Sequence, residues 1–492
     1  MKKRILLMFF IFAVLFMISC GENKTKKDVK PQNTGENASV EEVDENIADV
    51  KILPELPEIN YNNYVFNIIV SGNMGTNYIN DFHAEEETGD AIPDAVYRRN
   101  ITVEDNFGVR INALPIPGND AGQNAFKKSV LAQDHAYDAA MLGGYGASSL
   151  AMQGTLMDLN AVPWLDFTKP WWDQKAVKDL TIREKLFYMT GDFDTAANMD
   201  WTYCILFNKQ IAQNYAVENL YELVKAGKWT VDKFAEYAQL VSVDLNGDGK
   251  MNRDDLYGTL VWDDSMMGII NAAGEKCAIV NSAGELELTL YTERALRIFE
   301  KYTKVVFDKN IAFGYQRVGE FGEEMFANNQ ALFSVKTLFV VTETRAMETD
   351  FGILPYFKLD ETQSEYYNTV SSFFSRFLCV PMNQSGDELE RTGIIMEAIA
   401  AESKYTVRPA YYERSLKGKY ARDEDSEEML DIIFNTRTYD LGWFYAIGGY
   451  NEGIMNLYRK YNNDFTSMYD KAINSANKKI DQINEKFAEI LN

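Results

Sequence analysis

Residues 64–72 read YVFNIIVSG, an apolar and β-branched run that ends in a Ser-Gly turn, and this stretch decides the fold. Such a run predicts a buried β-strand. The residues that follow predict a helix over 95–107, a strand over 109–113, a helix over 123–132 and a strand over 137–142. A glycine turn over 143–146 then opens another helix. This alternation predicts a doubly wound α/β fold.

The rest of the chain continues the alternation and then becomes helical. Thr230 suits the N-cap of a helix, and residues 292–306 predict another. The final segment, 465–490, carries a long amphipathic stripe that we expect to pack against the protein itself, with a partner-binding or coiled-coil helix as the alternative. Further strands are predicted over 186–189, 203–207, 258–262, 285–290, 332–335, 352–356 and 377–380.

The composition limits the possible partners. The chain has 492 residues, 46% of them hydrophobic, which is enough for a large core divided into two domains or lobes. Its net charge of −24 disfavours nucleic acid and anionic lipid surfaces, and mainly supports solubility. Cys204, Cys277 and Cys379 are widely spaced, so we expect small buried hydrophobes rather than disulfides or a zinc site.

The N-terminus has the layout of a bacterial lipoprotein signal. Lys2, Lys3 and Arg4 precede the apolar run 5–18, and Ser19-Cys20-Gly21 follows. We expect cleavage before Cys20 and its acylation, which would tether the protein outside the cytoplasmic membrane by lipid alone. The alternative is an ordinary N-terminal membrane anchor. Residues 21–61 are polar and lack periodicity, as a disordered tether would be.

Residues 244–255 form the one specific chemical motif. They match the twelve-residue calcium loop, with glycine at its sixth position and an apolar residue at its eighth. We expect a structural Ca²⁺ here; the alternative is a solvated acidic turn, and the aspartate at the last position has a shorter arm than the usual glutamate. The expected ligands are Asp244, Asn246, Asp248, the carbonyl of Lys250, Asn252 and Asp255.

Aromatic residues with polar neighbours suggest a carbohydrate site, because sugar rings stack on flat side chains while Asp, Asn or Arg bind the hydroxyls. Trp201 and Trp262 stand at strand edges among polar residues, although most tryptophans in a chain of this size belong to the core. We take as ligand-binding candidates Tyr145, Asp192, Trp201, Trp262, Asp263, Arg376 and Trp443.

Few classes of enzyme fit this sequence. It has two histidines and none of the familiar hydrolase, phosphate-binding or dinucleotide-binding motifs. A glycosidase that uses only carboxylates is the surviving alternative, with Asp192 and Asp194 as its candidate pair.

The chain resembles the extracellular solute-binding proteins of family 1, which serve carbohydrate-type ABC importers. The resemblance rests on the order of short motifs: residues 137–142, the Gly-x-Leu-x-Asp-Leu segment within 154–159, Phe207-Asn208-Lys209, and residues 229–234 opening with Trp-Thr. The chain is longer than a typical member, and residues 387–450 depart from the pattern.

The resemblance implies two α/β lobes of the periplasmic-binding-protein type, joined by hinge crossings and followed by a helical C-terminal region. It implies a binding protein and not an enzyme: a monomer that captures a sugar or oligosaccharide and delivers it to a permease driven by a separate ATPase. A surface lipoprotein that uses this fold for adhesion or sensing is a further alternative. The expected division is 1–20 signal, 21–61 tether, 62–202 mainly lobe 1, 203–345 mainly lobe 2, and 346–492 crossings and C-terminal helices.

Overall fold

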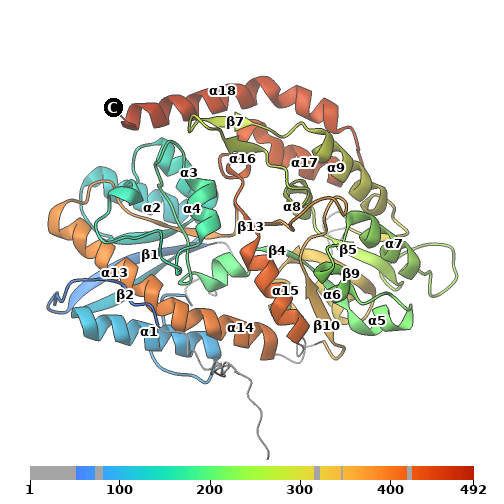
Figure 1. Ribbon diagram of the computed structural model, residues 1–492, viewed down its shortest axis with the longest axis horizontal. Helices are drawn as coiled ribbons and strands as arrows, with labels where there is room; N and C mark the ends of the chain where they lie inside the picture. The colour runs from blue at the N-terminus through green and yellow to red at the C-terminus, as the bar shows by residue number, and fades with distance from the viewer. Residues whose placement is uncertain (1–50, 73–80, 315–321, 345–346, 418–423, 492) are drawn as a thin grey trace, which may run out of the picture. The chain divides into compact units, whose positions relative to one another are not determined.

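A computed structural model describes residues 51–72, 81–314, 322–344, 347–417 and 424–491 (Figure 1). The predicted signal, the acylation of Cys20 and the tether up to residue 50 therefore lie outside the described residues. In the described part of the chain, no helix is long and apolar enough to cross a membrane. Residues 52–492 form one compact unit.

The first sheet is built around residues 64–72, which form β1. β1 is parallel to β2 and to β3, and β12 joins the other edge of β3 in the antiparallel direction. Phe66, Ile68, Ile69 and Val70 are all buried, as expected for a strand covered on both faces. The strands are β1 (Tyr64–Gly72), β2 (Val109–Pro117), β3 (Ala139–Gly143) and β12 (Arg376–Cys379), and the helices are α1 (Ala91–Phe107), α2 (Asn119–Ala132), α3 (Gly144–Met152) and α13 (Gly386–Tyr405).

The second sheet has the order β10-β4-β9-β5-β8. β5 is parallel to β8 and β9, whereas β4 runs antiparallel to β9 and β10. The strands are β4 (Tyr203–Asn208), β5 (Tyr257–Val261), β8 (Ala312–Phe313), β9 (Ala331–Thr337) and β10 (Phe351–Leu354). Its helices are α5 (Lys209–Asn214), α6 (Leu220–Lys225), α7 (Val231–Val241), α8 (Ser265–Ala272), α9 (Glu293–Val306), α11 (Glu323–Ala327) and α12 (Val340–Glu343).

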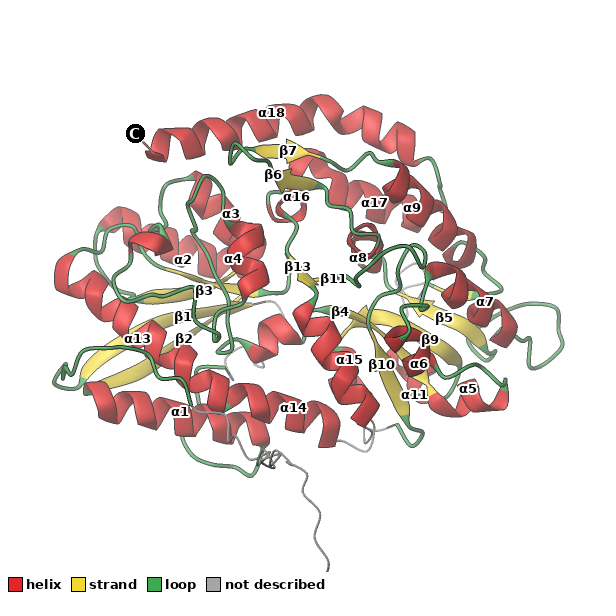
Figure 2. Cartoon of the chain, viewed as in Figure 1, coloured by secondary structure: helices red, strands yellow, loops and turns green. Residues whose placement is uncertain are grey.

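Each sheet with its helices makes one lobe, and three chain segments cross between the lobes. β11 (Asn368–Thr369) and β13 (Arg437–Thr438) pair in parallel, and Val370 forms a bridge with Thr202, just before β4. Figure 2 shows β11 and β13 between the two sheets. We call these three crossings the hinge.

The C-terminal region packs on both lobes. α14 (Val407–Lys417) lies against α1, and α15 (Glu424–Asn435) lies against β10. α18 (Phe465–Leu491) brings Phe487 to within 5.4 Å of the Phe187 ring in lobe 1 and Phe465 to within 5.0 Å of Phe299 in lobe 2. The prediction that the final segment packs against the protein itself is therefore confirmed. The remaining elements are α4 (Gln174–Leu180), β6 (Ala278–Val280), β7 (Leu286–Leu288), α16 (Leu441–Phe444), α17 (Tyr450–Arg459) and the short turns Leu159–Ala161, Thr195–Met199 and Ile447–Gly449.

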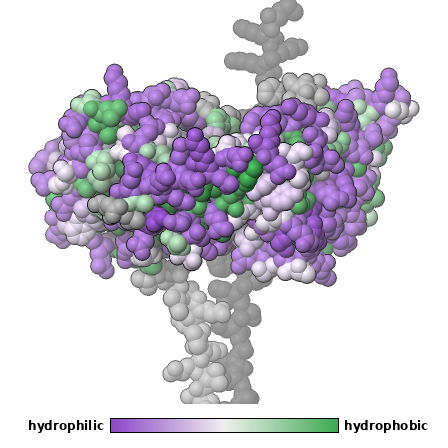
Figure 3. Space-filling view, turned by 90° about the horizontal axis from the view of Figure 1, so that it is seen from above, coloured by the Kyte–Doolittle hydropathy of each residue, from purple (hydrophilic) through white to green (hydrophobic). Residues whose placement is uncertain are grey.

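The α/β alternation predicted from the sequence is confirmed, with one exception. Residues 186–189 form no strand; Met189 alone makes a bridge, with Leu378 of β12. Leu186, Phe187 and Tyr188 are buried, so this run is apolar because it packs in the core and not because it pairs in a sheet. The three cysteines are buried and free, as expected. The face in Figure 3 is mainly hydrophilic, in keeping with the acidic composition.

Candidate functional site

Trp201 lies in the hinge, directly before β4, between two phenylalanine rings. Its ring stacks on Phe374 at 4.2 Å and on Phe339 at 4.8 Å, with interplanar angles of 17° and 15°. Phe374 lies in the crossing that contains β11, and Phe339 follows β9. This stack therefore joins lobe 2 to the hinge, and it leaves Trp201 only 5% exposed.

Trp262 extends the stack at the end of β5. Its ring is tilted toward Phe374 at 5.7 Å and is half-buried. Phe373 meets Phe374 edge-on at 4.8 Å and is 38% exposed. The aromatic rings therefore run from the buried hinge to the surface.

Tyr145, at the start of α3, is the contribution of lobe 1. Its ring lies 5.8 Å from Phe373, and its hydroxyl accepts a hydrogen bond of 2.8 Å from the Nδ2 atom of Asn451 in α17. Gly144 makes this approach possible, because a Cβ atom there would lie 2.6 Å from the carbonyl oxygen of Ser372. We call the following six residues the aromatic cluster: Tyr145, Trp201, Trp262, Phe339, Phe373 and Phe374.

Two aspartates follow Trp262 and make this side of the cluster acidic. Asp263 is buried and accepts a hydrogen bond of 2.5 Å from the Nε atom of Arg459, which also contacts Glu452 at 2.6 Å. The pKa of Asp264 is raised to about 7, mainly by burial and then by the charge of Asp263, while Arg459 opposes the shift. Aromatic faces beside carboxylates are the groups that bind a sugar ring and its hydroxyls.

The other three ligand-binding candidates make buried polar contacts with residues that are not part of the aromatic cluster. Asp192 pairs with Arg408 at 3.3 Å, and burial raises the pKa of its carboxyl. Arg376 is 1% exposed and pairs with Asp81 at 3.1 Å and with Asp194 at 3.6 Å. Trp443 is buried and donates from its Nε1 atom to Asn271 at 3.2 Å. The structure thus brings together Tyr145, Trp201, Trp262 and Asp263, and places the other three in the supporting core.

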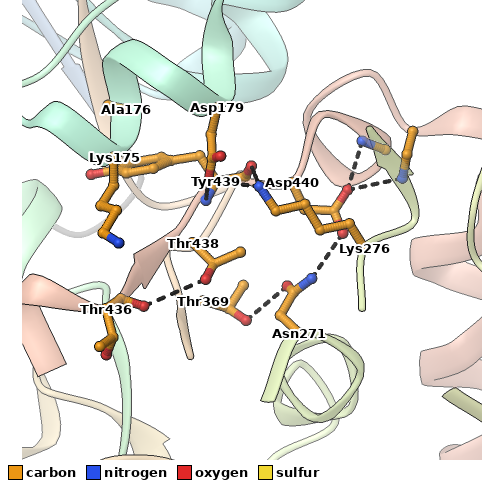
Figure 4. A network of polar contacts seen from close by, with 12 residues as sticks. Lys175, Ala176, Asp179, Asn271, Lys276, Thr369, Thr436, Thr438, Tyr439 and Asp440 are labelled. Atoms are coloured by element: carbon orange, nitrogen blue, oxygen red, sulfur yellow. Dashed lines mark hydrogen bonds and ion pairs between the residues drawn. The ribbon is translucent and has the colours of Figure 1, made fainter. Parts of the chain in front are cut away.

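A network of hydrogen bonds and ion pairs around Asn271, the partner of Trp443, stabilises the hinge. Lys276 of lobe 2 forms an ion pair of 2.7 Å with Asp179 of α4. Asn271 of α8 donates to Asp440 at 2.9 Å and accepts from Thr369 at 2.8 Å (Figure 4). Since α8 belongs to lobe 2 and Asp440 follows β13, these bonds hold the crossings against lobe 2.

Sequence reasoning missed Phe339, Phe373, Phe374, Asn451 and Arg459. The pair Phe373-Phe374 within a run of serines carried a usable signal, because adjacent aromatic residues in a polar segment seldom both enter a core. Arg459 and Asn451 carried none, because their positions depend on how α17 packs.

The loop 244–255 has the hydrogen bonds of a tight acidic turn. Asp244 accepts from the backbone N–H groups of Gly247 and Gly249, both at 2.7 Å, and Asp255 accepts from Leu245 and Asn252. Gly247 has φ +71°, the conformation for which glycine is suited. In the part of the chain that the structure describes, no three His, Cys, Asp or Glu side chains are grouped so that they could hold a metal ion. The donor types fit calcium, but in this arrangement the carboxylates are turned to backbone amides.

Two α/β lobes, three crossings between them and helices that pack on both lobes make up the fold in which the chain can be compared with solved structures. No protein-family model matches the chain, and no curated protein matches it in sequence.

Among solved structures, the chain is similar to an ABC substrate-binding protein from Listeria monocytogenes in complex with cycloalternan, with TM-score 0.53, 14% identity, and coverage of 87% of this chain and 99% of that one. It is also similar to a cyclic α-maltosyl-1,6-maltose binding protein from Arthrobacter globiformis, with TM-score 0.56, 15% identity, and coverage of 85% and 99%. A third similar structure is UgpB from Mycobacterium tuberculosis in complex with glycerophosphocholine, with TM-score 0.56, 16% identity, and coverage of 79% and 95%.

Proposed function

We propose that the protein is the substrate-binding component of an ABC importer and captures a sugar or oligosaccharide between its lobes. The observation that carries this proposal is the aromatic cluster, whose rings come from lobe 1, lobe 2 and the hinge and meet beside Asp263 and Asp264. Two of the similar structures, by their descriptions, bind cyclic oligosaccharides. Closure of the lobes around a ligand would bring these rings onto it.

Binding, and not catalysis, is the role that the carboxylates favour. Asp192 and Asp194, the candidate pair for a glycosidase, both lie in buried contacts with arginines, which occupy their carboxylates. A monomer that passes its ligand to a permease with a separate ATPase needs no chemistry of its own.

A sugar panel followed by thermal unfolding tests the proposal. A bound sugar should stabilise the protein, by about 2.7 kcal/mol at a hundred times its dissociation constant. Release of shorter products from an oligosaccharide would favour the glycosidase. Absence of any shift across mono-, di- and cyclic oligosaccharides would contradict carbohydrate binding.

We also propose that acylation of Cys20 holds the protein outside the cytoplasmic membrane, on the grounds of the signal sequence alone. The variant Cys20→Ala should move the protein from the membrane fraction to the soluble extracytoplasmic fraction, because the lipid is its proposed attachment. Ligand affinity should not change. Membrane retention of this variant would instead indicate an uncleaved anchor.

The loop 244–255 is proposed as a structural calcium site, from its spacing and donor types. Adding Ca²⁺ to protein stripped with EDTA should raise the midpoint of thermal unfolding, because an ion that binds only the folded state stabilises it. Asp248→Asn should reduce the gain, whereas Asp232→Asn on α7 should not. A midpoint indifferent to Ca²⁺ would identify a solvated acidic turn.

A further inference from the structure

One step of the loop 244–255, Asn246-Gly247, carries the groups for a reaction of the chain with itself. Both residues are exposed, and Asn246 lies in a bend. The backbone nitrogen of Gly247 is next along the chain to the side-chain amide of Asn246, so attack of this nitrogen on the amide carbon closes a succinimide ring. Glycine suits the attacking position, because it has no Cβ atom to hinder the approach.

A carboxylate contacts the attacking nitrogen. The Oδ1 atom of Asp244 accepts a hydrogen bond of 2.7 Å from the N–H group of Gly247. This distance lies within the range of about 2.6–3.2 Å at which a general base takes a proton. The Oδ2 atom of Asp244 accepts from the N–H group of Gly249, also at 2.7 Å, and this second bond keeps the carboxylate in position.

A donor contacts the amide that is attacked. The N–H group of Asp248 donates to the Oδ1 atom of Asn246 at 2.8 Å. Negative charge develops on this oxygen as the ring forms, and a donor that is already in place stabilises that charge. The loop therefore holds a nucleophile, a base and an oxyanion donor around one asparagine, at an exposed position that water can reach.

We propose that Asn246 is a site of spontaneous deamidation, at which the loop converts its own asparagine to aspartate and isoaspartate. The Gly247 nitrogen passes its proton to Asp244 and forms a bond to the side-chain carbonyl carbon of Asn246. The bond from this carbon to Nδ2 then breaks, and Nδ2 takes the proton from Asp244 and leaves as ammonia. Water opens the succinimide at either of its carbonyl groups. The amide and one water thus become a carboxyl group and ammonia, independently of the function proposed above.

Peptide mass spectrometry of the purified protein, kept at neutral pH with EDTA so that the loop is free of metal, tests the proposal. Trypsin releases residues 234–250, in which Asn246 is the only asparagine. The deamidated mass of this peptide should accumulate with time, as a mixture of aspartate and isoaspartate. The internal control is the peptide 472–478, because Asn474 and Ser475 are exposed but lie within α18. Equal accumulation in the two peptides, or none in 234–250, would overturn the proposal.

Matched variants separate the contacts of the loop from its sequence pattern. Asp244→Asn should slow the conversion about tenfold or more, because a positioned base contributes at least this much. Asp254→Asn, at an exposed position of the same loop, should not slow it. Gly247→Ala should slow the conversion, whereas Gly249→Ala, at a glycine with a similar φ of +79°, should not.

Circular dichroism establishes that each variant is folded, and fragmentation of the peptide assigns the change to Asn246. Conversion of Asp244→Asn at the rate of the unaltered protein would overturn the proposal, because the loop would then contribute nothing to the reaction.

Discussion

Replacing Arg376 with alanine is expected to lower the free energy of unfolding by about 3–5 kcal/mol, the cost of leaving buried charges without their partner. Arg376, Asp81 and Asp194 are all 1% exposed or less, so water cannot replace the guanidinium. Urea denaturation should report the loss as a lower midpoint with an unchanged slope.

The pH dependence of this variant follows from the carboxylates. Burial, with the charge of Asp81 next, raises the pKa of Asp194 well above its usual range, and Arg376 opposes the shift. A carboxyl whose folded pKa is raised binds more protons in the folded state, so stability falls as the pH rises through the interval between its unfolded and folded values. Without Arg376 this fall should be steeper, and Arg376→Ala should be less stable at pH 8 than at pH 5.

Two further variants separate charge from packing. Arg376→Lys keeps a positive charge and should recover part of the lost stability. Adding Asp194→Asn to Arg376→Ala removes one of the unpaired charges and should recover more of it at pH 8 than at pH 5. A loss below 1 kcal/mol in Arg376→Ala, on the scale of an exposed ion pair, would contradict the buried network.

Replacing Trp201 with alanine should have an effect of similar size, about 3–5 kcal/mol of stability, because it removes a buried ring stacked on both faces. It should also weaken ligand binding, since Phe339 and Phe374 lose the surface that positions them. Urea denaturation and calorimetry with a sugar identified in the panel would measure the two effects.

Trp262 and Trp164 provide the comparison. Trp262 is half-buried at the open side of the aromatic cluster, so Trp262→Ala should cost affinity with a smaller loss of stability. Trp164 is 42% exposed and its indole nitrogen donates to Glu390, which is not part of the aromatic cluster, so Trp164→Ala should change neither stability nor affinity by much. If Trp201→Ala and Trp164→Ala lost equal stability, the stack of Trp201 on Phe339 and Phe374 would not be stabilising the hinge.

The lobes could be predicted from the sequence because their strands are local apolar runs. β1, β2 and β3 with their helices follow one another, and β1 and β3 bury most of their residues, so short windows suffice to find them. The position of β12 beside β3 is different. It depends on pairing between segments far apart in the chain, which no local pattern encodes.

The candidate site divides in the same way. Trp201, Trp262 and Asp263 can be predicted because polar residues flank tryptophan at a strand edge, and the structure gathers them. Asp192 and Trp443 have similar local surroundings in sequence, yet Arg408 and Asn271, distant along the chain, hold them in the core. A single sequence does not distinguish a polar residue turned to a ligand from one turned to a buried partner.

The place of β12 in the first sheet also sets the order in which the chain can fold. Lobe 1 begins at β1, but its edge strand, residues 376–379, and the covering helix α13 arrive only after the whole sheet of lobe 2. During synthesis, one edge of β3 stays unpaired until β12 is made, and by then all strands of lobe 2 have been synthesised. Closing so long a loop is slow, so we expect lobe 2 to form first and lobe 1 to be completed late. A chain that leaves the cytoplasm during this interval would do so before β12 and α13 have completed its first lobe.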